Sequence, residues 1–124
     1  LGIGGLFIRS LDPERLAAWY RAHLHFTVTE AGQAAPDGTY LWQQQAGPTV
    51  VSIFAQASDY FAADRQMMLN LRVSGLEALT EQLQLAGVKV ITDEAWNHPE
   101  VGRFARIHDP DGNPIELWEP PSGQ

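Results

Sequence analysis

The apolar residues in the first half of the chain follow two different periods. Asp12 and Pro13 mark a helix start, because aspartate is a good N-cap residue and proline suits the first helical turn. The residues that follow place one apolar stripe at helical spacing: Leu16, Trp19, Tyr20 and Leu24. Short apolar or alternating runs predict strands at residues 6–10, 26–29, 39–44 and 49–55. The first half is therefore predicted to run strand, helix, strand, strand, strand.

The second half repeats this order of elements. Residues 68–73 form an apolar strand, and Ser74 to Glu77 has the Ser-x-x-Glu form of a capping box, so Ser74 is expected to cap a second helix. Gly87 is placed to end that helix in the left-handed conformation. The stripe of this helix is Leu76, Leu79 and Leu83, and the strands predicted after it are residues 88–92, 103–108 and 115–119. The last two strands are joined by residues 109–113, Asp-Pro-Asp-Gly-Asn, a hairpin-turn sequence.

The two halves align with each other at a shift of 63 or 64 residues. Residues 6–9 fall on residues 69–72 at the first shift, and residues 51–54 fall on residues 115–118 at the second. A duplicated unit dictates architecture, so we interpret the chain as one domain, 1–124, built from two βαβββ modules. The predicted boundaries are about 1–56 for module one, 57–65 for a linker and about 66–120 for module two. The linker contains Tyr60 and Phe61, which suggest that it packs against the rest of the protein.

Composition and charge exclude several classes of function. The chain has 8 Lys+Arg against 15 Asp+Glu, a formal charge of −7 and a single lysine, so nucleic acid is not an expected partner. The absence of cysteine excludes disulfides, thiolate metal sites and cysteine nucleophiles. The apolar runs are too short to span a membrane, and the first residues do not have the pattern of a signal peptide. We expect a cytoplasmic protein with no membrane association.

Two stretches of the chain carry a family resemblance. The closing stretch contains Asp-Pro-Asp-Gly-Asn-Pro-Ile-Glu-Leu at residues 109–117, and the first helix runs from Asp12-Pro13 through Ala18-Trp19-Tyr20 to Leu24. Together with the repeat, they resemble the vicinal oxygen chelate superfamily, which includes glyoxalase I, extradiol dioxygenases, fosfomycin-resistance enzymes and bleomycin-binding proteins. The resemblance implies an α+β fold in which two tandem βαβββ modules form a curved eight-stranded cup. It also implies a ligand on the concave face and a homodimer.

The resemblance further implies four positions for the ligands of a divalent metal. In this chain they are occupied by Gly5, Ser52, Met68 and Glu116. Glycine has no side chain, and serine and methionine are poor ligands for hard or borderline divalent ions. We therefore expect no metal and no other cofactor, with Ser52 and Met68 contacting the ligand instead. A divalent metal held by other side chains is the alternative.

Glu116, Arg9 and Arg72 are the charged candidates for the site. Glu116 is interpreted either as a buried carboxylate satisfied by Arg9, Arg72 or a water, or as a general base or a contact for a cationic ligand. Arg9 and Arg72 are equivalent under the repeat, four residues after Gly5 and Met68, so alternation places each arginine on the face of that position. The resemblance implies that they bind an anionic group of the ligand; the alternative is that each pairs with an acidic neighbour.

Three aromatic residues are expected on the same concave face by strand alternation: Phe7, Phe54 and Trp118. The function predicted from the resemblance is that of a glyoxalase/bleomycin-resistance-like protein that binds a small molecule in the cup without the family metal. The alternative is a glyoxalase- or dioxygenase-type enzyme, a lyase or isomerase, that uses a divalent metal or Glu116 as general base.

Overall fold

The structure, a computed structural model, describes residues 1–26 and 44–122. They belong to two compact units, Leu1–Pro48 and Thr49–Gln124, which are described one after the other. Two predicted strands lie almost entirely outside the described residues. Only residue 26 of the strand predicted at 26–29 and only residue 44 of the strand predicted at 39–44 are described.

The first unit contains one helix, α1 (Pro13–Leu24), among its described residues. The side chain of Asp12 accepts a hydrogen bond from the backbone N–H of Arg15 at 3.2 Å, and Pro13 opens the first turn. The C-cap residue that follows the helix, His25, has the left-handed conformation that usually favours glycine (φ 54°). The predicted start of the helix is confirmed, as is the burial of two residues of its apolar stripe, Leu16 and Tyr20.

The strand predicted at residues 6–10 is not formed, and residues 1–12 contain neither helix nor strand. The side chain of Phe7 is 95% exposed. A strand requires a neighbouring strand for its backbone N–H and C=O groups. The described residues of the first unit provide no such neighbour, so the apolar pattern alone does not produce a strand here.

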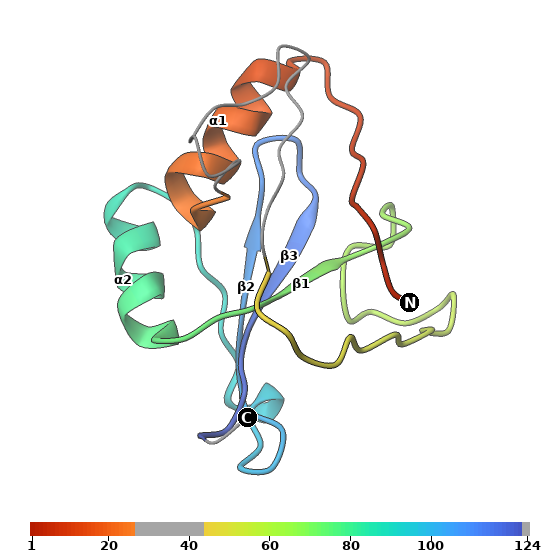
Figure 1. The fold of residues 1–124 in the computed structure, drawn as a ribbon, viewed down its shortest axis with the longest axis vertical. Helices are drawn as coiled ribbons and strands as arrows, with labels where there is room; N and C mark the ends of the chain where they lie inside the picture. Colours follow the sequence, from red (N-terminus) through yellow and green to blue (C-terminus); the bar gives the residue numbers. More distant parts are fainter. Residues whose placement is uncertain (27–43, 123–124) are drawn as a thin grey trace. The chain divides into compact units, whose positions relative to one another are not determined.

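The second unit is built on a three-stranded sheet (Figure 1). Its strands are β1 (Leu69–Arg72), β2 (Arg103–His108) and β3 (Pro114–Glu119), in the order β1-β3-β2. The central strand β3 pairs in parallel with β1 and antiparallel with β2. The strands predicted at 68–73, 103–108 and 115–119 are therefore confirmed, each to within one residue at either end.

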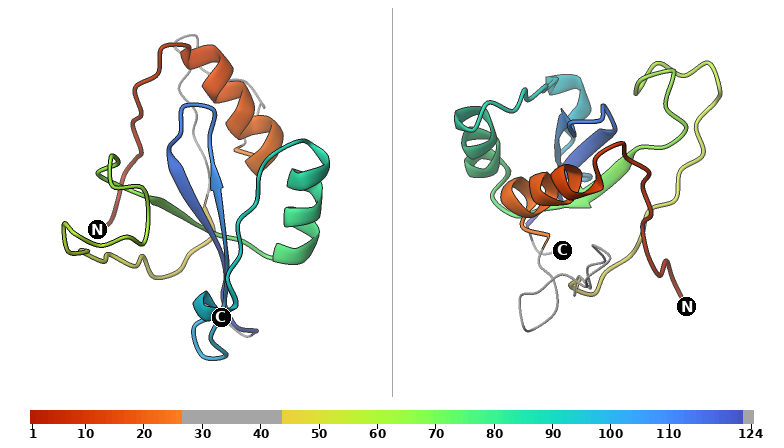
Figure 2. Two further views of the ribbon diagram at one scale, coloured as in Figure 1. Left: turned by 180° about the vertical axis from the view of Figure 1, so that it is seen from behind. Right: turned by 90° about the horizontal axis from the view of Figure 1, so that it is seen from above.

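One helix, α2 (Leu76–Leu85), lies on one side of this sheet, and the segment of residues 49–65 lies on the other (Figures 1 and 2). The predicted capping box is wrong. Gly75, not Ser74, is the N-cap, in a left-handed conformation (φ 65°) and without a side-chain cap. The N–H of Leu76 instead donates to a carboxylate oxygen of Glu119 at 3.1 Å, so the sheet itself supplies the acceptor for the helix start.

The end of α2 is as predicted, but the strand expected after it is not formed. Gly87 has a φ of 86°, in the left-handed region, and the N–H of Val88 returns to the carbonyl of Leu83 at 2.9 Å. The strand predicted at 88–92 is reduced to a single bridge between Ile91 and Arg106. The chain then turns into a short 3-10 helix, η1 (Glu94–Trp96), so no longer pairing is possible.

The hairpin between β2 and β3 forms around one buried carboxylate. Asp109 accepts from the backbone N–H groups of Asp111 and Asn113 at 3.0 and 2.9 Å, and from the side-chain amide of Asn113 at 2.7 Å. Gly112 provides the left-handed residue of the turn (φ 83°). This turn fixes the register that places Arg106 opposite Glu116.

The core of the second unit lies on the face of the sheet that α2 covers. Its buried side chains are Leu71, Leu76, Leu83, Ala105, Ile107, Ile115 and Leu117. On the other side, the strand predicted at 49–55 is absent, and Val50, Val51 and Ile53 are exposed. No helix among the described residues is both long and apolar enough to cross a membrane.

Candidate functional site

Two rows of side chains cross the face of the sheet opposite α2. Residues alternate between the two faces of a strand, so the neighbours of the buried residues point to this second face. The first row is Asn70, Glu116 and Arg106, on β1, β3 and β2. The second row, two residues further along β3, is Arg72, Trp118 and Phe104. Side chains of the hairpin strands β2 and β3 thus meet side chains of β1, about 30 residues earlier in the chain, on one surface.

Glu116 is buried, with 6% of its surface exposed, and each of its carboxylate oxygens accepts a hydrogen bond. One carboxylate oxygen accepts from the side-chain amide of Asn70 at 2.8 Å, and the other accepts from the hydroxyl of Tyr60. The latter oxygen also lies 3.6 Å from Nη2 of Arg106. The interpretation of Glu116 as a buried, satisfied carboxylate is thus supported, with Asn70, Tyr60 and Arg106 as its partners.

Tyr60 reaches this carboxylate from the segment that covers the sheet. Its partial burial, followed by the hydrogen bond and the negative charge of Glu116, raises the pKa of Tyr60 to about 12. The phenol therefore stays protonated at neutral pH and acts as the donor. The expectation that Tyr60 and Phe61 pack against the protein is confirmed, since both side chains are half-buried.

Arg106 is the most buried cation of the site, with 5% of its surface exposed. Its Nη1 donates to the backbone carbonyl of Tyr60 at 2.9 Å. The rings of Tyr60 and Trp96 lie near its guanidinium carbon, with centroids at 4.9 and 5.2 Å. Among the described residues, its Nε and Nη2 have no hydrogen-bond partner, although both are buried. A buried donor without an acceptor is costly, which makes this edge of the guanidinium exceptional.

A pocket of about 510 Å³ lies between residues 56–63 and the sheet. Its other lining side chains are Ile91, Trp96, Arg106 and His108. Partial burial, and then the charge of Arg106, lower the pKa of His108 below its usual 6.5. At neutral pH the lining of the pocket therefore includes a neutral imidazole, aromatic rings, the guanidinium of Arg106 and the carboxylate of Asp59.

Aromatic rings support the segment that forms one wall of this pocket. The centroid of the Tyr60 ring lies 5.3 Å from that of Phe54 and 6.1 Å from that of Trp96. The ring centroids of Phe54 and Phe61 are 5.8 Å apart.

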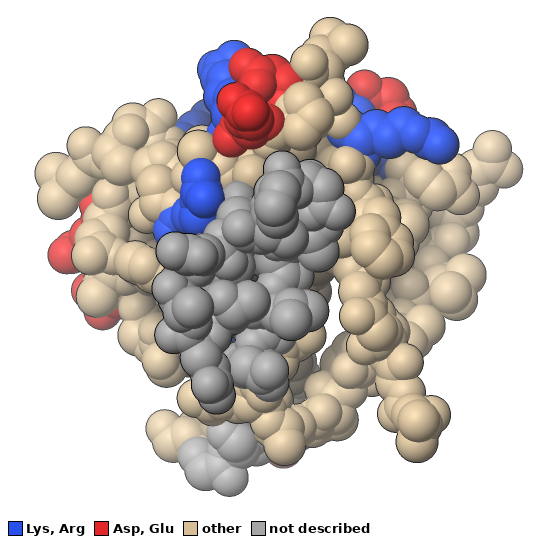
Figure 3. All heavy atoms as spheres, turned by 45° about the horizontal axis from the view of Figure 1, so that its top comes forward, with Lys and Arg blue, Asp and Glu red and all other residues tan. Residues whose placement is uncertain are grey.

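On the face of the molecule drawn in Figure 3, most of the described atoms belong to uncharged residues. Neither charge sign dominates that face.

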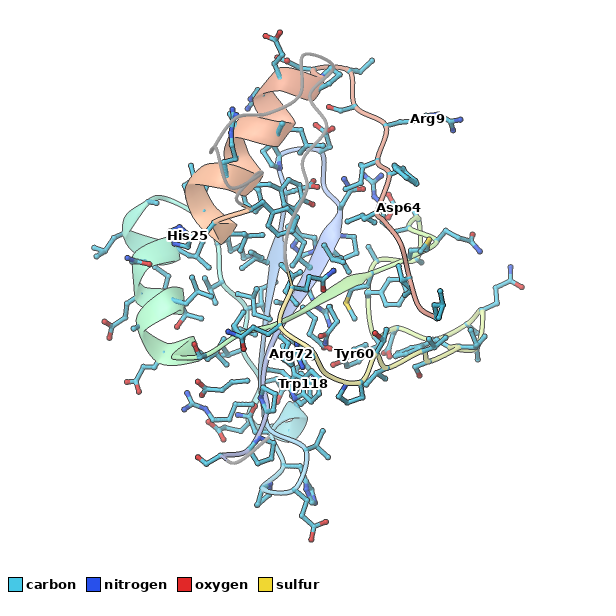
Figure 4. The ribbon with its side chains drawn as sticks, viewed as in Figure 1. Arg9, His25, Tyr60, Asp64, Arg72 and Trp118 are labelled. Atoms are coloured by element: carbon cyan, nitrogen blue, oxygen red, sulfur yellow. The ribbon has the colours of Figure 1, made fainter. Side chains whose placement is uncertain are left out.

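The second row contains an aromatic pair instead of a charged pair. Trp118 stacks on Phe104 with ring centroids 6.4 Å apart and planes 8° apart, and its Nε1 donates to the carbonyl of Val101 at 2.8 Å. Gly102 allows this packing, because a Cβ there would lie 2.7 Å from Nε1 of Trp118. Arg72, on β1, lies beside Trp118 of β3 (Figure 4) and not beside Glu116. As predicted, Arg72 and Trp118 are on the same face of the sheet as Glu116, but they lie one row away from it.

The remaining predicted site residues belong to both units of the chain. Phe54 contacts Tyr60, as described above, but Ser52 is exposed and lies outside any strand. Met68 is half-buried, one residue before β1. Arg9 and Phe7 belong to the first unit, where both are exposed and neither is on a strand.

Sequence reasoning missed four residues of the site: Tyr60, Asn70, Trp96 and Arg106. One of them, Arg106, could have been found by counting. Strands that leave a hairpin turn pair residue by residue, so the turn at 109–113 places residue 106 opposite residue 116. The sequence carries no signal that brings Tyr60, Asn70 or Trp96 to this face.

The four positions implied for a metal do not form a suitable donor set. Gly5 offers no side chain, Ser52 is exposed, and Met68 carries only a thioether. Glu116 is the one carboxylate, and Asn70, Tyr60 and Arg106 already engage it. Within residues 1–26 and 44–122, no three His, Asp or Glu side chains are grouped as a metal ion would require.

Comparison with known families gives the class of protein to which these features belong. Residues 5–118 match the family model described as "Glyoxalase-like domain". The chain therefore belongs to the glyoxalase-like family, within the vicinal oxygen chelate superfamily, and has an α+β glyoxalase-like fold with a mixed open sheet. The predicted superfamily is confirmed.

One solved structure is similar in fold over nearly the whole chain. It is the crystal structure of TnmS3, an antibiotic binding protein from Streptomyces sp. CB03234. The TM-score is 0.52 and the sequence identity 22%, with 97% of this chain and 98% of that chain covered. No curated protein matches the sequence.

Proposed function

We propose that the protein binds a small organic molecule in the pocket over Glu116 and Arg106, without a divalent metal. One observation carries this proposal: the only carboxylate of the four metal positions is already engaged by Asn70, Tyr60 and Arg106. A metal ion would have to displace these partners and would find few further ligands nearby.

The form of the pocket supports binding of an organic ligand. Its volume of about 510 Å³ falls within the roughly 300–1,000 Å³ common for small-molecule sites. Tyr60 and Trp96 offer ring surfaces, and Arg106 and Asp59 are the charged residues of the lining. Such sites combine an apolar lining with a few polar groups that orient the ligand. The similar fold of TnmS3, an antibiotic binding protein, is consistent with this proposal.

The same contacts favour binding over general-base catalysis by Glu116. A general base must present a lone pair to the proton that it removes. Both oxygens of Glu116 accept hydrogen bonds, and Arg106 lies 3.6 Å from one of them. In the proposed function Glu116 holds Tyr60 and Arg106 in position and does not react.

We further propose that the chain works as a homodimer in which the eight-stranded cup is complete. The support is the exposed apolar run of the second unit, where Val50, Val51 and Ile53 are 71%, 75% and 90% exposed. An exposed apolar run is a surface for pairing with another chain. Light scattering after size-exclusion chromatography should give the mass of a dimer; the mass of a monomer at micromolar concentration would contradict this part.

Metal analysis and a ligand screen on the purified protein test the main proposal. We expect substoichiometric Zn, Ni, Mn and Fe, and aromatic small molecules that raise the melting temperature equally with and without a chelator. The Trp96→Leu variant should lose this stabilisation, whereas Arg103→Gln, an exposed change on β2, should retain it. Stoichiometric metal, or ligand binding abolished by the chelator, would overturn the metal-free proposal.

A further inference from the structure

The guanidinium of Arg106 has one satisfied edge and one vacant edge. Nη1 donates to the carbonyl of Tyr60 at 2.9 Å, whereas Nε and Nη2 have no hydrogen-bond partner within residues 1–26 and 44–122. Nε and Nη2 lie on the same edge of a guanidinium, and together they form the fork that binds two oxygens of a planar oxyanion. The vacancy is therefore shaped for a pair of acceptors.

Glu116 does not occupy this fork. Its nearer oxygen lies 3.6 Å from Nη2, beyond hydrogen-bond distance, and accepts from the hydroxyl of Tyr60 instead. Its other oxygen accepts from Asn70. Glu116 thus balances the charge of Arg106 but leaves the two N–H groups of the fork unbonded.

Arg106 is one of the residues that line the pocket. The rings of Tyr60 and Trp96 lie over its guanidinium, with centroids at 4.9 and 5.2 Å from its carbon. Because Nε and Nη2 are buried, a ligand that binds them would have to displace one of these rings. Tyr60 belongs to a segment without helix or strand, so its ring is held by side-chain contacts and not by a backbone ladder.

We propose that the ligand carries a carboxylate that binds Nε and Nη2 of Arg106, with a flat apolar body against Tyr60 and Trp96. This inference rests on the proposed small-molecule function and specifies its ligand class. A carboxylate is the best match because its two oxygens accept both N–H groups in charge-assisted hydrogen bonds. Of the titratable groups around the fork, His108 adds no negative charge, whereas Asp59 lines the pocket and Glu116 lies 3.6 Å from Nη2.

Isothermal titration with two matched probes, naphthalene-2-carboxylate and naphthalene-2-carboxamide, tests the proposal. Both have the same flat body, but only the first is an oxyanion. We expect the wild-type protein to bind the carboxylate at least about tenfold more tightly than the carboxamide. In Arg106→Lys, which keeps the charge but lacks the fork, this ratio should fall, and in Arg106→Gln it should approach one. The control Arg103→Gln, on the same strand but exposed, should keep the wild-type ratio.

The outcomes separate this inference from the function on which it rests. Equal binding of the two probes to the wild-type protein would overturn the carboxylate proposal and leave the pocket function standing. If neither probe binds at millimolar concentration, both fail. Because Arg106→Gln leaves Glu116 without its cation, the double variant Arg106→Gln/Glu116→Gln serves as a second test of the ratio. An unchanged preference for the carboxylate in that variant would also overturn the proposal.

Discussion

The two faces of the sheet in the second unit are built from alternate residues of the same strands, yet they are organised in opposite ways. On the face under α2, Ala105, Ile107, Ile115 and Leu117 are completely buried and carry no polar side-chain atom. On the other face, Arg106 and Glu116 are nearly as buried but are charged. If the register of one strand shifted by one residue, its apolar side chains would move to the polar face of the sheet and its charged side chain to the apolar face.

The difference shows how stability and specificity are divided within one sheet. The apolar face gains free energy from burial in proportion to area, with no demand on direction. The polar face gains little net free energy from its ion pair, because desolvation offsets attraction, but it places each atom by hydrogen bonds. The polar face is therefore where a ligand can be recognised.

Removing one charge from the polar face should have the largest effect. Glu116→Ala leaves Arg106 buried without its counter-ion, and we expect a loss of about 3–5 kcal/mol in the free energy of unfolding. Replacing both residues by methionine should recover most of this stability, because it removes both desolvation costs, while ligand binding is lost. Urea denaturation measures the first effect and calorimetric titration the second. A double variant as unstable as Glu116→Ala would contradict this account of the pair.

Truncating the apolar face should be nearly as costly but should act differently. Leu117→Ala creates a cavity next to α2, and we expect a loss of about 2–5 kcal/mol in the free energy of unfolding. At a temperature where the variant is folded, its ligand affinity should remain near that of the wild type. Loss of affinity in the folded variant would show that the two faces are not separable.

The hairpin that keeps the two faces in register can be tested at its buried carboxylate. Asp109→Ala leaves the N–H groups of Asp111 and Asn113 without their acceptor, and we expect a loss of about 1–3 kcal/mol. Asp109→Asn, which retains one oxygen, should lose less. Both variants should be compared by thermal and urea unfolding; equal losses would show that the individual acceptor oxygens do not matter.

The smallest effect is expected from pH. The pKa of His108 is lowered in the folded protein, so the unfolded chain takes up the proton more readily. The contribution of His108 to stability is therefore fully present above pH 6.5 and is lost as pH falls below that value towards the lowered folded pKa. His108→Gln should reduce the slope of unfolding free energy against pH in this window. An unchanged slope would indicate that other groups cause the pH dependence.

Local signals predicted the elements whose structure depends on near neighbours. Helix α1 begins at Asp12 and Pro13 as expected, and the turn at 109–113 and its two strands form where the pattern placed them. The strand expected at 88–92 fails because only Ile91 finds a partner, Arg106. The cap expected from Ser74 fails because Glu119, distant in sequence, supplies the acceptor. In both cases the outcome depends on a contact that the local pattern does not contain.

The sequence by itself determined the family, the α+β class, the hairpin and the identity of Glu116 as the surviving charged position. These features depend on spacing and on residue type, which are properties of the chain alone. The hairpin register also determined that Arg106 lies opposite Glu116. Only the tertiary structure decided that Asn70, from β1, and Tyr60, from the segment before β1, complete the surroundings of Glu116, because no local pattern brings these segments to β3. The site is therefore a property of packing, because hydrogen bonds and burial depend on distances in space and not on positions along the chain.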